Sequence, residues 1–393
     1  MMLSKFSRGL TILTNRSKNL AEPSNLKSII VLTKRDFSID EIGKRFEKPF
    51  DYKKKQYGLF DQIFDSTMSK LGENSLIISV EGNFGSGKSN FAKKLAKEID
   101  FVYAKEPELD SHLYQLPNGH NARQIINEYV KDNELYRIDS LEEWHLNPSY
   151  KKTISLQHAF YNIRWMQTRT ALLHLMSTGQ GVVLERTAHS DSVIAQALYE
   201  NKLLSDQAYR FYLRDLVPNT ITELWRPHVV IYLDKSPEEC LKTIKSNGKP
   251  FEKDSKVYTL DLLKSIEKNY KKSFLPEMRN HLHILNFKSN EIDTERIIEE
   301  LELLDFEDQH KFNDWRVRKE TTINTYRKIL ANYEQCIETL LAPNSFVDVP
   351  EYLWYGEELS KLHNKLAEDP RMETKNAGLF AGLGSQYQQR EWL

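Results

Sequence analysis

Five short apolar runs predict the strands of a sheet. They are Leu76–Glu81, Phe101–Ala104, Gly181–Leu184, His228–Leu233 and Leu282–Asn286. Each run is apolar throughout or nearly so, as strands buried on both faces of a parallel sheet must be. Segments with helical spacing alternate with these runs, so the order of elements predicts a doubly wound α/β fold.

The helical segments are set by apolar positions that recur every three or four residues. The longest predicted helix covers about Ile154–Met176 and is closed by Gly179. Others are predicted at Asp191–Glu200, Ser205–Leu216, Pro237–Ser246 and Leu260–Tyr270. Towards the C-terminus one helix face carries Ile323, Tyr326, Leu330, Tyr333, Ile337 and Leu340, and Pro343–Asn344 ends that helix. This face packs either on its own domain or on a partner.

Composition indicates a large ordinary globular protein, with 393 residues of which 40% are hydrophobic and 28% charged. The net charge of -1 argues against nucleic-acid binding as the main role. The two cysteines, Cys240 and Cys336, are too few for a disulfide framework and lack metal-site spacing, so we expect reduced thiols. No apolar run reaches the roughly 20 residues that span a bilayer, so we expect no transmembrane segment.

The N-terminus has the composition of a mitochondrial presequence. The first 35 residues contain seven Lys and Arg against one acid, Glu22, among Leu, Ile, Phe, Ser and Thr. Arg35 lies three residues before Ser38, which fits mitochondrial processing and predicts residues 1–37 as a transit peptide. The alternative is a disordered basic arm.

A complete phosphate-binding motif, GxxxxGK(S/T), lies between the first predicted strand and a helix. Its residues are Gly82, Asn83, Phe84, Gly85, Ser86, Gly87, Lys88 and Ser89. In such a loop backbone N–H groups surround phosphate oxygens, while Lys88 reaches the outer phosphates and Ser89 ligates Mg²⁺. The motif therefore predicts a nucleotide site, with Mg²⁺ as a candidate ion.

Further polar residues follow the predicted strands or share a helix face. Glu106–Pro107 follows the second strand, and Glu185–Arg186–Thr187 ends the third, with Asp191 shortly after. Gln157, Tyr161 and Arg164 lie on one face of the long helix. Ordinary structural interpretations stand beside each of these: an exposed loop acid at Glu106, a solvated stripe at Gln157 and Arg164, an ion pair between Glu185 and Arg186, and a loop acid or helix cap at Asp234.

With these motifs in this order, Leu76–Asn286 resembles the deoxyribonucleoside kinases. The resemblance implies a P-loop kinase fold, with a five-stranded parallel sheet wrapped by helices. It implies that Glu106 is the general base for a sugar 5′-hydroxyl, that Arg186 holds the reacting region, and that Glu185 helps Ser89 to place Mg²⁺. It assigns Gln157, Tyr161, Arg164 and Asp191 to the nucleoside. Thr187 and Ser192 depart from the Ser and Arg of that family.

The lid of such a kinase is where the sequence departs most. Active members carry Arg residues after the fourth strand that close over the phosphates of ATP, whereas Leu241–Pro250 contains Lys and no Arg. Lysine lacks the bidentate fork of arginine. We therefore expect nucleotide binding to persist while turnover is absent or slow.

Nearly the whole mature chain resembles the deoxynucleoside-kinase-like accessory subunits of mitochondrial NADH:ubiquinone oxidoreductase, respiratory complex I. The segments that carry this resemblance are Tyr52–Tyr57, Phe60–Asp65, Thr178–Arg186, Pro227–Leu233 and Phe274–Met278. It implies a non-redox subunit on the matrix side of the inner membrane, in contact with other complex I subunits and supporting their assembly or stability. The alternative is an active mitochondrial deoxynucleoside kinase that transfers phosphate from ATP.

The same resemblance implies a bound purine nucleotide, ATP, ADP or dGTP. FAD has been attributed to the family, but no flavin motif is visible here, and neither is a GxGxxG loop or an iron–sulfur cysteine set. The predicted organisation is a transit peptide at 1–37, an N-terminal extension at 38–74, a kinase-like domain at 75–302 and a C-terminal extension at 303–393. Tyr52–Asp65 and the tail after Pro350 are expected to act as straps onto partners.

Overall fold

The structure, a computed structural model, describes residues 50–52, 55–116, 118–131, 136–288, 294–306, 311, 319–332, 349 and 357–372. The part from Asp51 onward forms one compact unit. The predicted transit peptide, Ser38, Cys336 and the tail after residue 372 lie outside the described residues.

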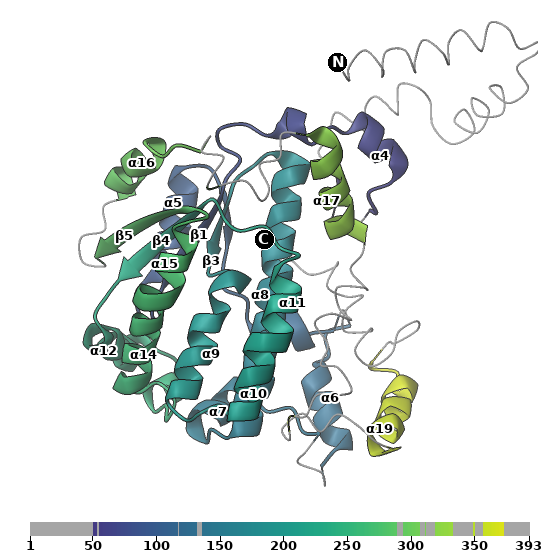
Figure 1. Cartoon of the computed structure of the whole chain (residues 1–393). Helices are drawn as coiled ribbons and strands as arrows, with labels where there is room; N and C mark the ends of the chain where they lie inside the picture. Colours follow the sequence, from purple (N-terminus) through teal and green to yellow (C-terminus); the bar gives the residue numbers. More distant parts are fainter. Residues whose placement is uncertain are drawn as a thin grey trace, which may run out of the picture. The chain divides into compact units, whose positions relative to one another are not determined.

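A five-stranded parallel sheet forms the centre of the molecule (Figure 1). Its strands are β1 (Ile77–Gly82), β2 (Val102–Ala104), β3 (Val182–Glu185), β4 (Val229–Asp234) and β5 (His283–Lys288), in the order β2-β3-β1-β4-β5. All five predicted strands are confirmed, with ends shifted by one or two residues. The predicted α/β fold class is confirmed as well.

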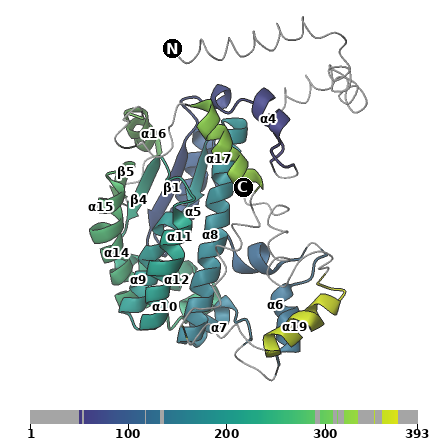
Figure 2. The ribbon, with the colours of Figure 1, turned by 45° about the vertical axis from the view of Figure 1, so that its right-hand side comes forward.

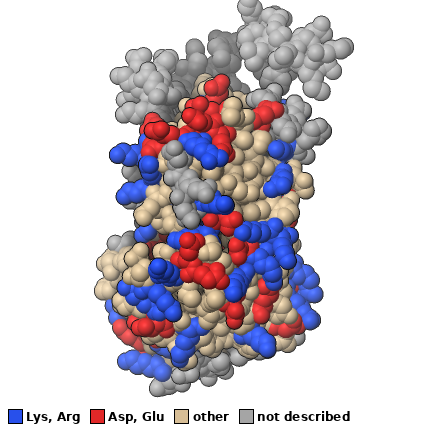
Figure 3. Space-filling model, turned by 90° about the vertical axis from the view of Figure 1, so that its left-hand side faces the viewer, with Lys and Arg blue, Asp and Glu red and all other residues tan. Residues whose placement is uncertain are grey.

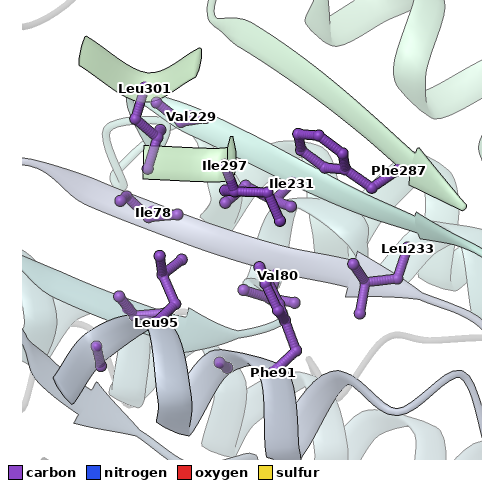
Figure 4. Packing of buried hydrophobic residues seen from close by; sticks show 13 residues of the cluster. Ile78, Val80, Phe91, Leu95, Val229, Ile231, Leu233, Phe287, Ile297 and Leu301 are labelled. Atoms are coloured by element: carbon purple, nitrogen blue, oxygen red, sulfur yellow. The ribbon is translucent and has the colours of Figure 1, made fainter. Parts of the chain in front are cut away.

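Alternation along the strands divides the buried residues between the two faces of the sheet. Ile78 is paired with Val229, and Val80 with Ile231, so these four side chains share a face. Helices α5 (Lys88–Glu98) and α16 (Thr294–Glu302) cover that face, and Figure 4 shows side chains of both helices among those of the strands. The opposite face is also buried, which explains the continuously apolar strands.

The longest helix, α8 (Tyr150–Thr178), contacts β1 and β3. The Ser149 side chain caps it by accepting a hydrogen bond from the Lys152 backbone N–H, and Gly179 ends it with a positive φ of 79°. Most of its residues are buried. It is longer than the predicted 154–176 at both ends.

The other helices surround this framework. The long connection before α8 holds α6 (Ala122–Tyr129) and α7 (Leu141–Leu146), and α9 (Asp191–Glu200) follows β3. After it come α10 (Asp206–Arg210), α11 (Val217–Ile221), α12 (Pro237–Asn247), α13 (Pro250–Lys253), α14 (Leu260–Asn269) and α15 (Leu275–Met278). The extensions contribute α4 (Leu59–Phe64), α17 (Glu320–Asn332) and α19 (Glu357–Glu368). Two short 3-10 turns are η1 (Met68–Lys70) and η3 (Ala188–Ser190).

The predicted helix Ser205–Leu216 contains a wide π-helical turn, and the predicted helix Leu260–Tyr270 continues into another; the sequence analysis missed both. These turns are η4 (Phe211–Leu216) and η5 (Tyr270–Phe274), and a third, η2 (Asp110–Tyr114), follows β2. Pro218 follows η4 and Pro276 follows η5. Proline has no N–H and clashes with the carbonyl four residues earlier, which in both cases lies inside the wide turn. The widened turn lets the chain continue as a helix.

The extensions pack on their own domain where the structure describes them. In α17 the Tyr326 ring stacks on Trp225 with centroids 3.9 Å apart, and Arg327 is fully buried. For residues 320–332 the domain-packing alternative is therefore correct, while Tyr333 onward lies outside the described residues. Leu362, Leu366 and Met372 join a hydrophobic cluster with α6 residues, and Figure 2 shows α19 beside α6.

The expectation of a reduced thiol agrees with the described residues. Cys240 is buried and free, and burial raises the pKa of its thiol to about 11, as expected for a reduced packing residue. On the face in Figure 3, basic side chains are interspersed with acidic ones. Within the described part of the chain no helix is both long and apolar enough to cross a membrane.

Candidate functional site

The phosphate-binding loop joins the carboxyl end of β1 to the N-terminus of α5. Gly85 has φ 73°, and a Cβ there would lie 2.6 Å from the Cys240 carbonyl oxygen, so only glycine fits this contact with α12. Gly82 has φ 148°, and its Cβ would lie 2.9 Å from the Leu233 carbonyl oxygen. The loop is thus held between β4 and α12.

Lys88 is buried within this loop. Its side chain is 6% exposed and its Nζ donates to the Asn83 carbonyl oxygen at 2.9 Å. Burial, together with the nearby charge of Arg186, lowers the pKa of Lys88 to about 8. Because an anionic phosphate favours the charged ammonium, this lysine is suited to a phosphate ligand.

The two residues predicted to hold Mg²⁺ are in contact. Ser89 Oγ donates to Glu185 Oε2 at 2.6 Å, and the hydroxyl of Tyr103 donates to the other oxygen of Glu185. Among the described residues there is no group of three or more His, Cys, Asp or Glu side chains able to hold a metal ion by themselves. Ser89 and Glu185 could contribute two oxygen ligands if phosphate oxygens and water supplied the others.

Glu106 lies between two buried arginines. Its Oε1 is 2.7 Å from Arg164 Nη2 and 3.0 Å from Arg186 Nη1, and both arginine side chains are at most 4% exposed. Burial alone would raise the pKa of Glu106, but the charges of Arg186, Arg164 and Lys88 outweigh it and hold the pKa well below its usual range. Glu106 is therefore a carboxylate in an ion-pair network, and not an exposed loop acid.

Arg164 also forms an ion pair with Asp191, which ties the long helix to the start of α9. Gln157 Nε2 donates to Asp191 Oδ2 at 2.6 Å and to the Tyr212 hydroxyl at 3.2 Å. Gln157 and Arg164 are each 4% exposed, so the solvated-stripe interpretation is wrong. The structure brings Gln157, Arg164, Asp191 and Glu106 together at the carboxyl edge of the sheet.

Tyr161 is placed apart from this group. Its hydroxyl lies 2.6 Å from Thr220 Oγ1 on α11, and its ring contacts Tyr212 edge-on. Tyr161 is fully buried. Its ring packs against Tyr212, which Gln157 also contacts. Among the described residues, Tyr161 forms no hydrogen bond with Arg164 or Glu106.

Arg186 is the most constrained of the predicted site residues. Its φ of 65° is rare for a residue with a side chain, and Nη2 donates to the Gly82 carbonyl oxygen at 2.9 Å. The guanidinium carbon lies 4.5 Å from the Phe84 ring centroid. The alternative of an ion pair with Glu185 is wrong, because the carboxylate paired with Arg186 is Glu106. Asp234 pairs with Lys271 at 2.9 Å.

Several residues of this region were missed by the sequence analysis. Glu81 is completely buried and accepts hydrogen bonds from Ser79 Oγ, the Tyr270 hydroxyl and the Thr187 N–H. Burial raises its pKa, against the effect of these bonds and of Arg186. The position of Glu81 directly before Gly82, the first residue of the phosphate-binding motif, could have indicated that it belongs to the site. Tyr103 and Tyr212 come from elements whose register the sequence does not define.

The segment after β4 meets the loop through lysine and aromatic side chains. Lys235 Nζ donates to the Gly85 carbonyl oxygen at 3.2 Å and to Thr243 Oγ1 at 2.7 Å. Beyond α13 the Tyr258 ring lies 4.8 Å from Phe84 and 4.5 Å from His145. Residues on either side of 241–250 thus contact the phosphate loop, Lys235 through a hydrogen bond and Tyr258 through its ring.

Residues 78–311, more than half of the chain, match the family model described as deoxynucleoside kinase. The chain belongs to the deoxynucleoside kinase family. The loop geometry and the network of Glu106, Arg164 and Arg186 are thus features of a member of this family.

Several individual relatives are similar over more than the kinase-like part. The chain is 31% identical over 321 residues, 81% of this chain and 85% of the relative, to NADH dehydrogenase (ubiquinone) 1 alpha subcomplex subunit 10, mitochondrial, of Rattus norvegicus. It is 26% identical to deoxyguanosine kinase of Dictyostelium discoideum, covering 66% of this chain and 82% of that one. A solved structure of deoxyadenosine kinase from M. mycoides with bound dATP has 20% identity and a TM-score of 0.41, covering 58% of this chain and 99% of that one.

Proposed function

We propose that this deoxynucleoside kinase family member is an accessory, non-redox subunit of mitochondrial respiratory complex I that supports its assembly or stability. The observation that carries the proposal is the 31% identity over 85% of the rat NADH dehydrogenase subunit, against 26% identity to a deoxyguanosine kinase. In this role the kinase fold is a scaffold that holds a nucleotide.

The nucleotide part of the proposal rests on the phosphate loop. A buried lysine with a lowered pKa, next to a helix N-terminus, favours an anion in its place. We propose a purine nucleotide, ATP, ADP or dGTP, with Mg²⁺ between its phosphates and the Ser89–Glu185 pair. The nucleoside would lie against Gln157, Arg164 and Asp191.

The proposed placement in the cell rests on the basic composition of residues 1–37 and on the similarity to a mitochondrial relative. We propose that residues 1–37 direct import, that the mature chain starts near Ser38, and that it is peripheral on the matrix side of the inner membrane. The kinase-like domain would cover 75–302, with extensions at 38–74 and 303–393. Residues 357–372 pack on α6, so a strap onto partner subunits would be formed by other parts of the tail.

An active deoxynucleoside kinase is the second candidate, and one observation favours it. Glu106 and Arg186 lie 3.0 Å apart beside the phosphate loop, where a base and a phosphate-binding cation are needed. Against it stand the lysines in place of arginine in 241–250 and the double ion pair of Glu106, which makes its carboxylate a weak proton acceptor.

The size of the native assembly separates the two candidates. Mild detergent extracts of mitochondria would be resolved by native electrophoresis and the chain detected with an antibody. We expect comigration with NADH dehydrogenase activity, and loss of complex I when the chain is depleted. A chain found only near the mass of a monomer or dimer would refute subunit membership.

Rescue of the depleted cells then tests whether kinase chemistry is needed. A Glu106→Gln variant should restore complex I if the chain acts as a nucleotide-holding scaffold. Restoration by the wild type alone, with equal levels of both proteins, would favour the kinase candidate.

A further inference from the structure

Two hydroxyl groups share the carboxylate of Glu185, one on each oxygen. Glu185 is the last residue of β3 and is 1% exposed. Ser89 Oγ donates to Oε2 at 2.6 Å, and the Tyr103 hydroxyl donates to Oε1. Ser89 is the last residue of the phosphate-binding motif. Tyr103 comes from a different element, β2, and has no part in that motif.

The register of the sheet brings Tyr103 to Glu185. Tyr103 is paired with Val183 of the neighbouring parallel strand. Side chains alternate along a strand, so Val183 and Glu185, two positions apart, lie on the same face of the sheet as Tyr103. Glu185 is therefore the diagonal neighbour of Tyr103, one step nearer the carboxyl edge, and the length of a tyrosine side chain covers that step.

The ring of Tyr103 is held by the core. It packs against the hydrophobic cluster drawn in Figure 4, to which α5 contributes Phe91 and Leu95. A tyrosine has few rotatable bonds, so packing of the ring also places the hydroxyl. The hydroxyl oxygen lies 3.4 Å from the Ser89 carbonyl oxygen as well. Tyr103 thus reaches the start of α5 and the end of β3 at once.

The two hydroxyl contacts have different consequences for a metal ion. A serine hydroxyl that donates its hydrogen keeps lone pairs with which to ligate Mg²⁺, so the contact between Ser89 and Glu185 is compatible with the ion. A carboxylate can only accept, so the Tyr103 hydroxyl directs its hydrogen at Oε1, and the positive end of that bond repels a cation there. The residues fit Mg²⁺ on the side of Ser89 and hinder it on the side of Tyr103.

Magnesium is sensitive to such a competitor. It requires a near-ideal octahedron of oxygens at about 2.0–2.1 Å and gives up its water reluctantly. To use Oε1, the ion or its water must replace the bond from Tyr103, and hydrogen bonds to a charged group are stronger than those between neutral groups. Because Glu185 is buried, bulk water cannot readily compensate for the loss.

We propose that Tyr103 weakens Mg²⁺ binding at the Ser89–Glu185 pair, so that the phosphate loop holds its nucleotide with only a weakly bound ion. This inference rests on the proposed nucleotide site and identifies a residue that sets its preference for metal. Phosphoryl transfer uses Mg²⁺ to bridge the phosphates and neutralise developing charge. Tyr103 therefore favours holding a nucleotide over turning it over, by a route separate from the lysines in 241–250.

Calorimetric titration with ADP tests the proposal on the purified mature protein, once in excess Mg²⁺ and once in EDTA. The factor by which Mg²⁺ strengthens ADP binding reports, by linkage, how tightly the occupied site holds the ion. We expect this factor to be about tenfold or more larger in Tyr103→Phe than in the wild type. Phenylalanine keeps the ring in the hydrophobic cluster, so the variant should still bind ADP in EDTA.

Tyr129→Phe is the matched control. The Tyr129 hydroxyl donates to Asp369 Oδ2 at 3.0 Å, so this change also removes a bond from a tyrosine to a carboxylate, but in the contact between α6 and α19. The Mg²⁺ factor of the control should equal that of the wild type. An equal factor in Tyr103→Phe would overturn the proposal. A smaller factor there would overturn it too, because the tyrosine oxygen would then be a ligand of the ion.

A direct measurement of metal affinity supplements the calorimetry. Mn²⁺ takes oxygen ligands as Mg²⁺ does, and its binding to the ADP complex can be followed by electron paramagnetic resonance. Tyr103→Phe should bind Mn²⁺ more tightly than the wild type. Equal Mn²⁺ affinities would contradict the proposed role of Tyr103.

Failure of this inference is distinguishable from failure of the proposed function. Comigration with complex I measures membership, and binding of ADP in EDTA measures the nucleotide site itself. A wild type that binds ADP with the same Mg²⁺ factor as Tyr103→Phe refutes only the role of Tyr103. A wild type that binds no ADP in either solution refutes the nucleotide site and this inference with it.

Discussion

At the scale of single residues, Lys88 decides whether the loop can hold a phosphate. We predict that Lys88→Ala weakens binding of ATP, ADP or dGTP by about 1.5–3 kcal/mol, the value of a charge-assisted contact in a partly desolvated site. Thermal shift and calorimetric titration of both proteins would measure this. Lys97→Ala is the control, because Lys97 is an exposed residue in the last turn of the same helix. Equal stabilisation of wild type and Lys88→Ala by all three nucleotides would contradict the prediction.

The lowered pKa of Lys88 makes nucleotide binding depend on pH. In the empty protein Lys88 loses its proton as the pH rises past about 8, whereas a bound phosphate keeps it charged. Affinity should therefore fall above that pH, by up to about tenfold per pH unit. The stability of the empty protein changes in the opposite direction. The folded pKa of Lys88 lies below its unfolded value of about 10.4, so the free energy of unfolding rises as the pH increases from about 8 to about 10.4. Titrations with ADP at several pH values would show this for the wild type but not for Lys88→Ala.

Glu106 holds two buried guanidinium groups in place, so its neutral replacement should be costly. We predict that Glu106→Gln lowers the free energy of unfolding by about 3 kcal/mol, because Arg186 loses its carboxylate and Arg164 keeps only Asp191. Since its folded pKa is depressed, this stabilisation is present above its ordinary pKa of about 4.3 and is lost as the pH falls below it.

Urea unfolding would measure this difference, with Glu108→Gln as the control. Glu108 pairs with exposed Lys105 at 2.7 Å, and such surface pairs contribute about 0–1 kcal/mol. If the two variants unfold alike, the network around Glu106 does not stabilise the fold.

At the scale of elements, local patterns predicted most of the framework. The five strands were predicted because buried parallel strands are short and continuously apolar. The phosphate loop was predicted because the spacing of its Gly, Lys and Ser residues is specific to that loop conformation. The π-helical turns were missed because the spacing of apolar residues predicts a helix but does not show that its turns widen before Pro218 and Pro276. Periodicity also placed Tyr161 with Gln157 and Arg164, but its hydroxyl turns to Thr220 on α11.

Contacts between distant segments could not be predicted. Asp65 and Arg327 are 262 residues apart, and nothing in either local pattern selects the other. The same holds for Phe84 with Tyr258 and for α6 with α19. These pairs depend on how whole elements pack, which a single sequence does not encode in its periodicity.

The contact between α6 and α19 gives a prediction at this scale. Leu366 is 1% exposed in a cluster with Ile125 and Ile126, so Leu366→Ala should weaken the docking of α19 by about 2–4 kcal/mol. Because this cluster is separate from the sheet core, we expect faster hydrogen exchange in 122–129 and 357–368 and unchanged exchange in β1 and β4. Exposed Lys365→Ala on the same helix is the control, and unchanged exchange in α6 would argue against the docking.

At the scale of the whole molecule, the residues expected to bind a nucleotide are retained, whereas the segment after β4 lacks the arginines expected for phosphoryl transfer. Ser89, Glu185, Glu106 and Arg186 lie together at the edge of the sheet, while Lys235 and the Tyr258 ring contact the phosphate loop. Nucleotide binding needs only the residues at the edge of the sheet. Phosphoryl transfer also needs cations that close over the phosphates as charge develops.

We therefore predict that phosphorylation of deoxynucleosides by the purified chain is absent or far slower than the roughly 1–100 s⁻¹ of kinases. Each missing arginine clamp removes about two or more powers of ten. The assay would follow transfer from labelled ATP to each of the four deoxynucleosides, with Lys88→Ala reporting any contaminating kinase. Turnover in the ordinary range that disappears in Glu106→Gln would mean that lysines suffice in 241–250, and the chain would then have to be regarded as a working kinase.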